Sequence, residues 1–247
     1  MAKNNNKKAA RKTAHQPNQT VAAKNHFELK EIEPLTDNQA RTFDAYDDGK
    51  NLLIHGYAGT GKTFISLYLA LDDILTGKSK YDKIIIVRSV VPSRDMGFLP
   101  GSAADKAKVY EEPYREICNT LFGRGEGYEI LKTKNLVHFT TTSFLRGLTF
   151  NNAIVIVDEM QNMLFPEIDT VMTRLGDNTK VIFCGDFRQT DFRKDDEKSG
   201  LFKFMQILGR MNNFEHVEFN QEDIVRSGIV KDYIIKKCKL EDENIHA

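Results

Sequence analysis

The segment 51–63 contains residue types at the spacing that binds a phosphate group. An apolar run at 52–54 leads into the pattern G-x-x-x-x-G-K-T, which extends from Gly56 to Thr63 and precedes a helical pattern. In such a Walker A loop, glycines allow tight turns whose backbone N–H groups point at phosphate oxygens. Lys62 is expected to face the β- and γ-phosphates of ATP, and the Thr63 hydroxyl to hold Mg²⁺. The alternative is a glycine-rich turn without a ligand, but every fixed position is filled and both flanks fit. The predicted nucleotide-binding residues of this loop are Gly56, Tyr57, Ala58, Gly59, Thr60, Gly61, Lys62 and Thr63.

A second pair of reactive side chains, Asp158 and Glu159, ends the apolar run that begins after Asn152. A buried strand of this kind delivers carboxylates to the carboxyl edge of a parallel sheet, beside the phosphate loop. We expect Asp158 to hold Mg²⁺ and Glu159 to act as the general base that polarises the attacking water. Any strand can end in acids, but these two lie downstream of a complete Walker A loop, which favours a Walker B strand.

Buried strands must position these side chains. Apolar runs that are too continuous for a half-exposed sheet predict an α/β fold with a mainly parallel sheet. The expected strands are 52–54, 83–89, 135–142, 152–159, 180–186 and 216–220. Helical patterns are expected at 35–46, 64–75 and 103–122 and from Ile229 onward. Gln189 follows the strand at 180–186, where a polar side chain can sense the γ-phosphate; the alternative is an ordinary loop residue.

The composition is that of a globular protein, with 247 residues, 40% hydrophobic and 28% charged. No apolar stretch approaches the ~20 residues of a transmembrane helix, so no membrane partner is expected. The three cysteines, Cys118, Cys184 and Cys238, are far apart and form no CxxC pair. We therefore expect reduced thiols and a cytoplasmic location.

The zero net charge conceals a basic N-terminal arm. Residues 1–26 carry six lysines and arginines and no acid, which leaves a charge of −6 on the rest of the chain. The arm is poor in large apolar residues and is expected to be disordered. It either adds phosphate contacts with nucleic acid or serves as a solubilising tail. The predicted organisation is a disordered basic arm at 1–30, one ATPase domain at 31–240 and a polar tail at 241–247.

Several further motifs give the chain a resemblance to the PhoH-like (phosphate-starvation-inducible) ATPases, a branch near the superfamily 1 helicases. The match covers roughly residues 35–237. The motifs are Gly97-Phe-Leu-Pro-Gly101, Phe144-Leu-Arg146-Gly147-Leu-Thr-Phe150, Asp158-Glu-Met-Gln161-Asn162, Thr173-Arg174-Leu-Gly176, Gly185-Asp-Phe-Arg-Gln189-Thr-Asp191 and Asp223-Ile-Val-Arg226. The chain departs from the family pattern at Ser89, Leu148 and Phe187, two of them near the expected nucleic-acid face.

The resemblance implies a RecA-like P-loop NTPase fold, ATP hydrolysis, assembly into a homo-oligomeric, hexameric ring, and action on RNA or single-stranded DNA. In helicase-like ATPases a glutamine ahead of the phosphate loop contacts the adenine edge, and Gln39 stands at that place; the alternative is an ordinary polar surface residue. A single RecA-like domain has no second lobe to supply an arginine finger. We therefore expect a catalytic arginine to act in trans from a neighbouring subunit, with Arg226 favoured over Arg174 and Arg193; the alternative for each arginine is a surface ion pair.

Three functions remain open. The leading hypothesis is an ATP-driven, helicase-like enzyme on single-stranded nucleic acid, contacted by strand-end side chains opposite the ATP site. The expected contact residues are Arg88, Ser89, Thr141, Thr142, Phe144 and Arg146. A small-molecule kinase is the second hypothesis, although Glu159 beside Asp158 is placed to activate water. The third is a nucleotide-gated scaffold that binds a protein partner and turns over slowly.

Overall fold

One six-stranded sheet forms the centre of the protein. The computed structural model describes residues 27–77, 80–89, 103–186 and 195–245. The strands are β1 (Asn51–Gly56), β2 (Lys83–Arg88), β3 (Val137–Thr141), β4 (Ala153–Asp158), β5 (Thr179–Gly185) and β6 (Phe214–Phe219). Their order across the sheet is β3-β2-β4-β5-β1-β6, and every neighbouring pair is parallel. The carboxyl ends of all six strands therefore meet at one edge.

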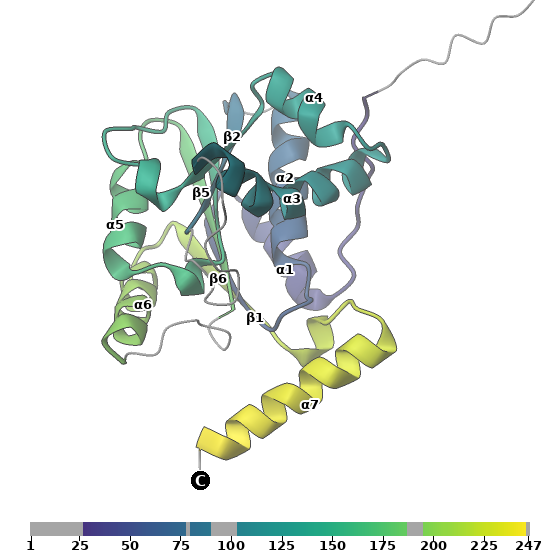
Figure 1. Cartoon of the computed structure of the whole chain (residues 1–247), viewed down its shortest axis with the longest axis vertical. Coiled ribbons are helices and arrows are strands. Elements are labelled where there is room, and N and C mark those ends of the chain that lie inside the picture. Colours follow the sequence, from purple (N-terminus) through teal and green to yellow (C-terminus); the bar gives the residue numbers. More distant parts are fainter. Residues whose placement is uncertain (1–26, 78–79, 90–102, 187–194, 246–247) are drawn as a thin grey trace, which may run out of the picture.

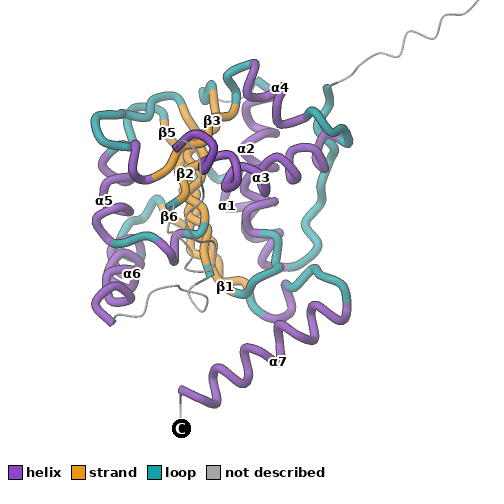
Figure 2. The backbone as a smooth tube through the Cα atoms, in the orientation of Figure 1, coloured by secondary structure: helices purple, strands orange, loops and turns teal. Residues whose placement is uncertain are grey.

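Helices cover both faces of the sheet (Figures 1 and 2). They are α1 (Asp37–Asp47), α2 (Lys62–Thr76), α3 (Ala103–Phe122), α4 (Gly127–Thr133), α5 (Phe165–Thr173), α6 (Asp195–Leu208) and α7 (Gly228–Ile245). Helices α1 to α4 lie on one face, and α5 and α6 lie on the other. Helix α7 extends away from the sheet at the end of the chain. No described helix is long and apolar enough to span a membrane.

The strands are apolar on both sides because each face has its own core. In β4, Ile154 and Ile156 belong to the core under α1 to α4, whereas Val155 and Val157 belong to the core under α5 and α6. All six β4 residues are buried. A run of branched apolar residues is what a parallel strand covered on both faces requires. The α/β class and the mainly parallel sheet predicted from the sequence are confirmed.

The structure also contains elements that the sequence analysis did not identify. Helices α4, α5 and α6 are too short or too irregular in pattern to stand out from the polar residues around them. Helix α7 continues to Ile245, well into the segment expected to be a polar tail. The remaining expected helices and strands match the structure within a few residues.

Residues 27–30 pack against the core, although the sequence analysis assigned them to the disordered arm. The Phe27 ring stacks on Phe122 with centroids 4.1 Å apart and planes 8° from parallel. The Lys30 N–H donates to the Leu121 carbonyl at 2.9 Å. The folded part of the chain therefore begins by Phe27. Residues 1–26 lie outside the described residues, so their disorder stays a prediction.

A buried aspartate ties the first helix to the end of the last strand. Asp223 is 2% exposed and accepts hydrogen bonds from the Thr36 hydroxyl at 2.5 Å and the Asn38 amide at 2.8 Å. Its carboxylate also accepts the Asn220 N–H at 2.7 Å. Thr36 caps α1 by accepting from the Gln39 N–H. One carboxylate thus fixes the start of α1 relative to the loop that follows β6.

Replacing this carboxylate by an amide tests its role. In Asp223→Asn, the new NH₂ group must face one of the present donors, which leaves a buried polar group unsatisfied. We expect the free energy of unfolding to fall by about 1–3 kcal/mol, measured by urea denaturation. Asp169→Asn, at an exposed position on α5, is the matched control and should change little. Equal stability of both variants would contradict the role given to Asp223.

Candidate functional site

The loop between β1 and α2 has the backbone shape of a phosphate-binding loop. Gly56, Gly59 and Gly61 have positive φ angles of 121°, 74° and 85°. A Cβ on Gly56 would lie 2.0 Å from the Phe219 carbonyl oxygen, so the close packing of this loop on β6 requires glycine there. Gly61 precedes the first turn of α2, and the N–H groups of that turn face the loop.

Lys62 extends back over this loop. Its ammonium donates to the carbonyls of Gly56 at 2.9 Å and Tyr57 at 2.6 Å. Burial lowers the pKa of Lys62, while the nearby charge of Asp186 opposes that shift. A half-buried cation in this position attracts an anionic ligand more strongly than an exposed one does.

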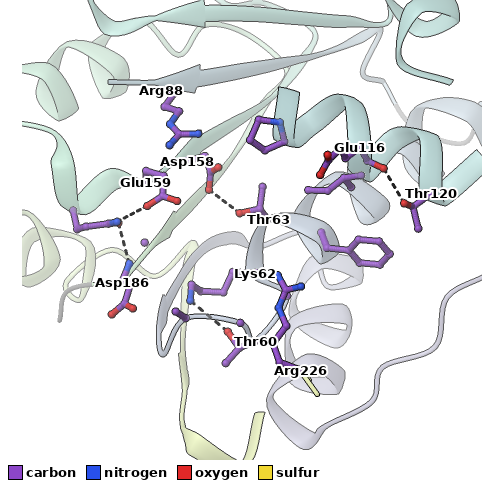
Figure 3. A pocket seen from close by; sticks show the side chains of 18 residues that line it. Thr60, Lys62, Thr63, Arg88, Glu116, Thr120, Asp158, Glu159, Asp186 and Arg226 are labelled. Carbon is purple, nitrogen blue, oxygen red and sulfur yellow. Dashed lines mark hydrogen bonds between the residues drawn. The ribbon is translucent and has the colours of Figure 1, made fainter. Parts of the chain in front are cut away.

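Thr63 and Asp158 meet at the centre of the site. The Thr63 hydroxyl donates to Asp158 Oδ1 at 2.8 Å (Figure 3), and the Tyr114 hydroxyl donates to Oδ2 at 2.8 Å. Burial raises the pKa of Asp158, the adjacent Glu159 adds to this, and the two hydrogen bonds counteract it. A hydroxyl beside a carboxylate fits Mg²⁺, which is bound by one or two protein oxygens with water and substrate phosphates. The predicted metal residues therefore lie together.

Glu159 is fixed by a glutamine that the sequence analysis quoted without assigning a role. Gln161 is 2% exposed, and its amide donates to the Glu159 carboxylate. Its carbonyl accepts the Asp186 N–H at 2.9 Å, which joins Glu159 to the end of β5. A Cβ on Gly185 would lie 2.9 Å from the Gln161 Oε1 atom, so glycine there permits this approach. The candidate base is thus held between two strands.

These residues line a cleft of about 540 Å³ (Figure 3). The phosphate loop forms one wall, Asp158 and Glu159 form another, and α3 contributes Glu116 and Thr120. A smaller cleft of about 250 Å³ adjoins it near Gly59 and Gly61. The smaller cleft is lined by apolar side chains, by one amide and by two charged side chains, namely Ile32, Leu35, Phe64, Ile65, Val225, Gln39, Glu33 and Arg226.

Gln39 lies in the smaller cleft, at the base of the phosphate loop. Its Nε2 donates to the Thr60 carbonyl at 3.1 Å, and its Oε1 accepts the Leu35 N–H at 2.8 Å. The side chain therefore links the segment before α1 to the phosphate loop. An amide has two donors and two acceptor lone pairs, so capacity remains for the edge of a base.

Arg226 lies in the cleft of its own chain. A Cβ on Gly59 would be 2.9 Å from the Arg226 Cγ, and the Val225 N–H donates to the Gly59 carbonyl at 3.1 Å. Arg226 lines both clefts, and Figure 3 shows it beside Lys62. The sequence analysis expected this arginine to act in trans, which stays a prediction, but the loop after β6 brings it to its own phosphate loop and so favours a role in its own chain. Of the other two candidates, Arg174 caps α5 beside the residues that precede β4, at the opposite edge of the sheet.

Arg88 also differs from its expected position. We assigned it to a nucleic-acid face away from the ATP site, but it lines the main cleft with Lys62 and Thr63. It is the last residue of β2 and lies level with Asp158 of β4. The strand order explains the result, because β2 is the direct neighbour of β4.

The other expected nucleic-acid residues lie at or after the ends of β2 and β3, towards one edge of the sheet. The Ser89 and Thr142 hydroxyls both donate to Glu167 of α5, and Thr141 is buried. Phe144 and Arg146 are exposed. Outside the described residues lie Gln189, Arg193, Phe187 and the motif at 97–101, so their predicted roles are neither supported nor contradicted.

Comparison with known proteins agrees with this site. The sequence profile described as PhoH-like protein matches residues 31–237. A PhoH-like protein of Mycobacterium leprae (strain TN) is 29% identical over 217 residues, which cover 87% of this chain and 61% of the relative. Protein PhoH of Escherichia coli (strain K12) is 32% identical over 193 residues, which cover 77% of this chain and 54% of the relative. The chain thus spans little more than half the length of these relatives.

A solved structure supports the fold. The large terminase of a thermophilic bacteriophage superimposes with a TM-score of 0.50 at 13% identity, over 81% of this chain and 50% of that one. Together with the parallel sheet and the phosphate loop at the end of β1, this defines a RecA-like P-loop NTPase core. The sequence profile then makes the assignment specific. The chain belongs to the PhoH-like protein family, as its motifs predicted.

The position of Arg226 predicts the result of a mixing experiment. Lys62→Ala and Arg226→Ala each damage the cleft of the chain that carries them, so a mixture of the two proteins should be no more active than the sum of its parts. ATP turnover should be measured at several mixing ratios, with subunit exchange followed by native mass spectrometry. Activity above that sum in an exchanging mixture would show that Arg226 acts in a neighbouring subunit.

Proposed function

We propose that this protein is a Mg²⁺-dependent ATPase that acts on RNA or single-stranded DNA and resembles a helicase motor. One observation carries the proposal: Lys62, Thr63, Asp158 and Glu159 come from two distant segments and converge in one cleft. A phosphate loop alone supports nucleotide binding. The addition of a fixed carboxylate at the same cleft supports hydrolysis.

The adjoining cleft suits a nucleobase. Its volume of about 250 Å³, its apolar walls and the Gln39 amide resemble a small-molecule site in which few polar groups set orientation. Phe64 offers an aromatic face, and Gln39 offers both a donor and an acceptor, as the edge of adenine requires. The triphosphate would then extend along Gly59 and Gly61 into the main cleft.

Each side chain has a distinct part in hydrolysis. Lys62 binds the β- and γ-phosphates and neutralises their charge, while Glu159 accepts a proton from the water that attacks the γ-phosphorus. Thr63 and Asp158 would hold Mg²⁺, which when bound neutralises phosphate charge. Gln161 keeps the Glu159 carboxylate in place. Arg226 binds the nucleotide from its own chain.

The proposed nucleic-acid contacts lie beyond β3. Phe144 is 61% exposed on a short turn after β3, and the exposed Arg146 and Leu148 follow it. An exposed aromatic ring beside a cation can stack on a base and contact its phosphate. The basic residues of 1–26 could add salt-dependent phosphate contacts.

Assembly into a ring, hexameric as the family resemblance implies, is part of the same proposal. Helix α7 presents Ile229, Tyr233 and Leu240, with 81%, 67% and 60% exposure, on a segment that extends from the body. Exposed apolar groups on a projecting element are typical of a subunit contact.

We place the protein in the cytoplasm, in agreement with the three buried free cysteines.

A small-molecule kinase fits the site less well, since a kinase must keep water from the γ-phosphate. Here Gln161 fixes the Glu159 carboxylate within the cleft, where we expect it to accept a proton from water. A slowly hydrolysing scaffold would use the same residues. It differs from a motor in that nucleic acid would not change its ATPase rate.

Two substitutions should separate ATP binding from ATP turnover. Lys62→Ala should abolish ATP binding because it removes the cation of the phosphate loop. Glu159→Gln should retain ATP binding but lower turnover by about 100- to 10,000-fold, the usual contribution of a general base. Calorimetry and phosphate release measure the two quantities, with the exposed Glu126→Gln as control. Hydrolysis by Glu159→Gln at the wild-type rate would exclude Glu159 as the base.

Nucleic acid should stimulate turnover through Phe144. We expect poly(U) RNA or single-stranded DNA to raise the ATPase rate, and Phe144→Ala to weaken that response while leaving the basal rate unchanged. A stacked base contributes about 1–3 kcal/mol, so affinity should fall at least severalfold. Phe202→Ala on α6 removes a ring of matched exposure, 60% against 61%, and should have no effect. A rate that no nucleic acid changes would favour the scaffold.

A further inference from the structure

Arg88 lies at the main cleft, and none of the roles proposed above for the cleft residues involves it. It ends β2, pairs in register with Asp158 and lines the cleft with Lys62 and Thr63. Figure 3 shows Arg88 and Lys62 on opposite sides of the two carboxylates. A group bound between the phosphate loop and Glu159 would therefore lie between two cations.

Two tyrosines of α3 lie beside this arginine. The Tyr114 hydroxyl donates to Asp158 Oδ2 at 2.8 Å and is close enough to the guanidinium to raise the pKa of Arg88. The Arg88 Cζ lies 5.6 Å from the centre of the Tyr110 ring, within the range of a cation–π contact. Tyr110 and Tyr114 are four residues apart and so lie on one face of the helix. Helix α3 thereby fixes the direction of the Arg88 side chain.

The charges around Arg88 keep it protonated at the cleft. Burial lowers the pKa of Arg88, but Tyr114, Asp158 and Glu159 together raise it above its ordinary value. A planar guanidinium carries N–H donors that point in several directions. While one side contacts a neighbouring residue, the other donors remain available to bind a phosphoryl group.

We propose that Arg88 is a catalytic arginine that acts in cis on the γ-phosphoryl group during hydrolysis, positioned by Tyr110 and Tyr114. This inference rests on the proposed ATPase function. The water oxygen forms a bond to the γ-phosphorus and its proton passes to Glu159. The bond to the β–γ bridging oxygen breaks, and ADP leaves with the electron pair. Arg88 donates to the γ-phosphoryl oxygens as charge develops on them, which is the part of an arginine finger.

The test compares ADP alone with ADP plus aluminium fluoride, which imitates the transferring phosphoryl group, both in the presence of Mg²⁺. Arg88→Ala should bind ADP within a few fold of wild type but bind the aluminium fluoride complex at least ~100-fold more weakly, since arginine fingers contribute about 10³–10⁵ to rate. Arg88→Lys should recover only part of this, because an ammonium lacks the planar fork. Arg210→Ala, exposed between α6 and β6, is the control.

The positioning role needs a separate pair of variants. Tyr114→Phe removes the hydroxyl that donates to Asp158 beside Arg88 but keeps the ring. It should weaken binding of ADP–aluminium fluoride relative to ADP, by less than Arg88→Ala does. Tyr128→Phe on α4 is a matched control, because Tyr128 is fully buried and its hydroxyl has no hydrogen-bond partner in the described part of the chain.

Several outcomes would overturn the inference. Arg88→Ala could weaken both complexes equally, which would make the arginine structural, or neither, which would leave it without a role in hydrolysis. Weaker binding of RNA with an unchanged preference for aluminium fluoride would return Arg88 to the nucleic-acid face. If wild-type protein neither hydrolyses ATP nor prefers ADP–aluminium fluoride to ADP, the ATPase function itself is wrong, and this result is distinct from a failure of Arg88 alone.

Discussion

The parallel register of the central sheet is the constraint on which the site depends. Because β1, β2, β4 and β5 run in the same direction, their carboxyl ends bring the phosphate loop, Arg88, Asp158 and Asp186 to one edge. The hydrogen bond of 2.8 Å between Thr63 and Asp158 closes this arrangement across β5. Cores on both faces hold the strands in place, so polar groups gather where the strands end. The fold thereby supplies the geometry that nucleotide chemistry needs.

Hydrogen bonds connect the residues at this edge of the sheet to one another and to the neighbouring elements. Gln161 joins Glu159 to the end of β5, Tyr114 joins Asp158 to α3, and Asp223 joins the start of α1 to the loop that carries Arg226. Buried hydrogen bonds of this kind are costly to leave unpaired, which favours one arrangement of the site. A change in α3 or at Asp186 is therefore expected to alter the position of the reacting groups.

The sequence was sufficient for the elements with strong local patterns. Six apolar runs predicted the strands, and the motifs predicted Lys62, Thr63, Asp158 and Glu159 at one site, because spacing alone specifies a phosphate loop. It was insufficient for Arg88 and Arg226, whose positions depend on strand order and on the path of the loop after β6. The short helix α4 and the docking of Phe27 on Phe122 likewise depend on tertiary contacts that no local pattern records.

The central claim is that one chain contains every group needed to hydrolyse ATP. A crystal structure of the protein with ADP, Mg²⁺ and aluminium fluoride tests it most directly. The account predicts the fluoride group between Lys62 and Arg88, with Thr63 and Asp158 at the metal and Arg226 of the same chain beside the nucleotide. An arginine from a neighbouring chain at the fluoride group, with Arg88 turned away from it, would contradict the account.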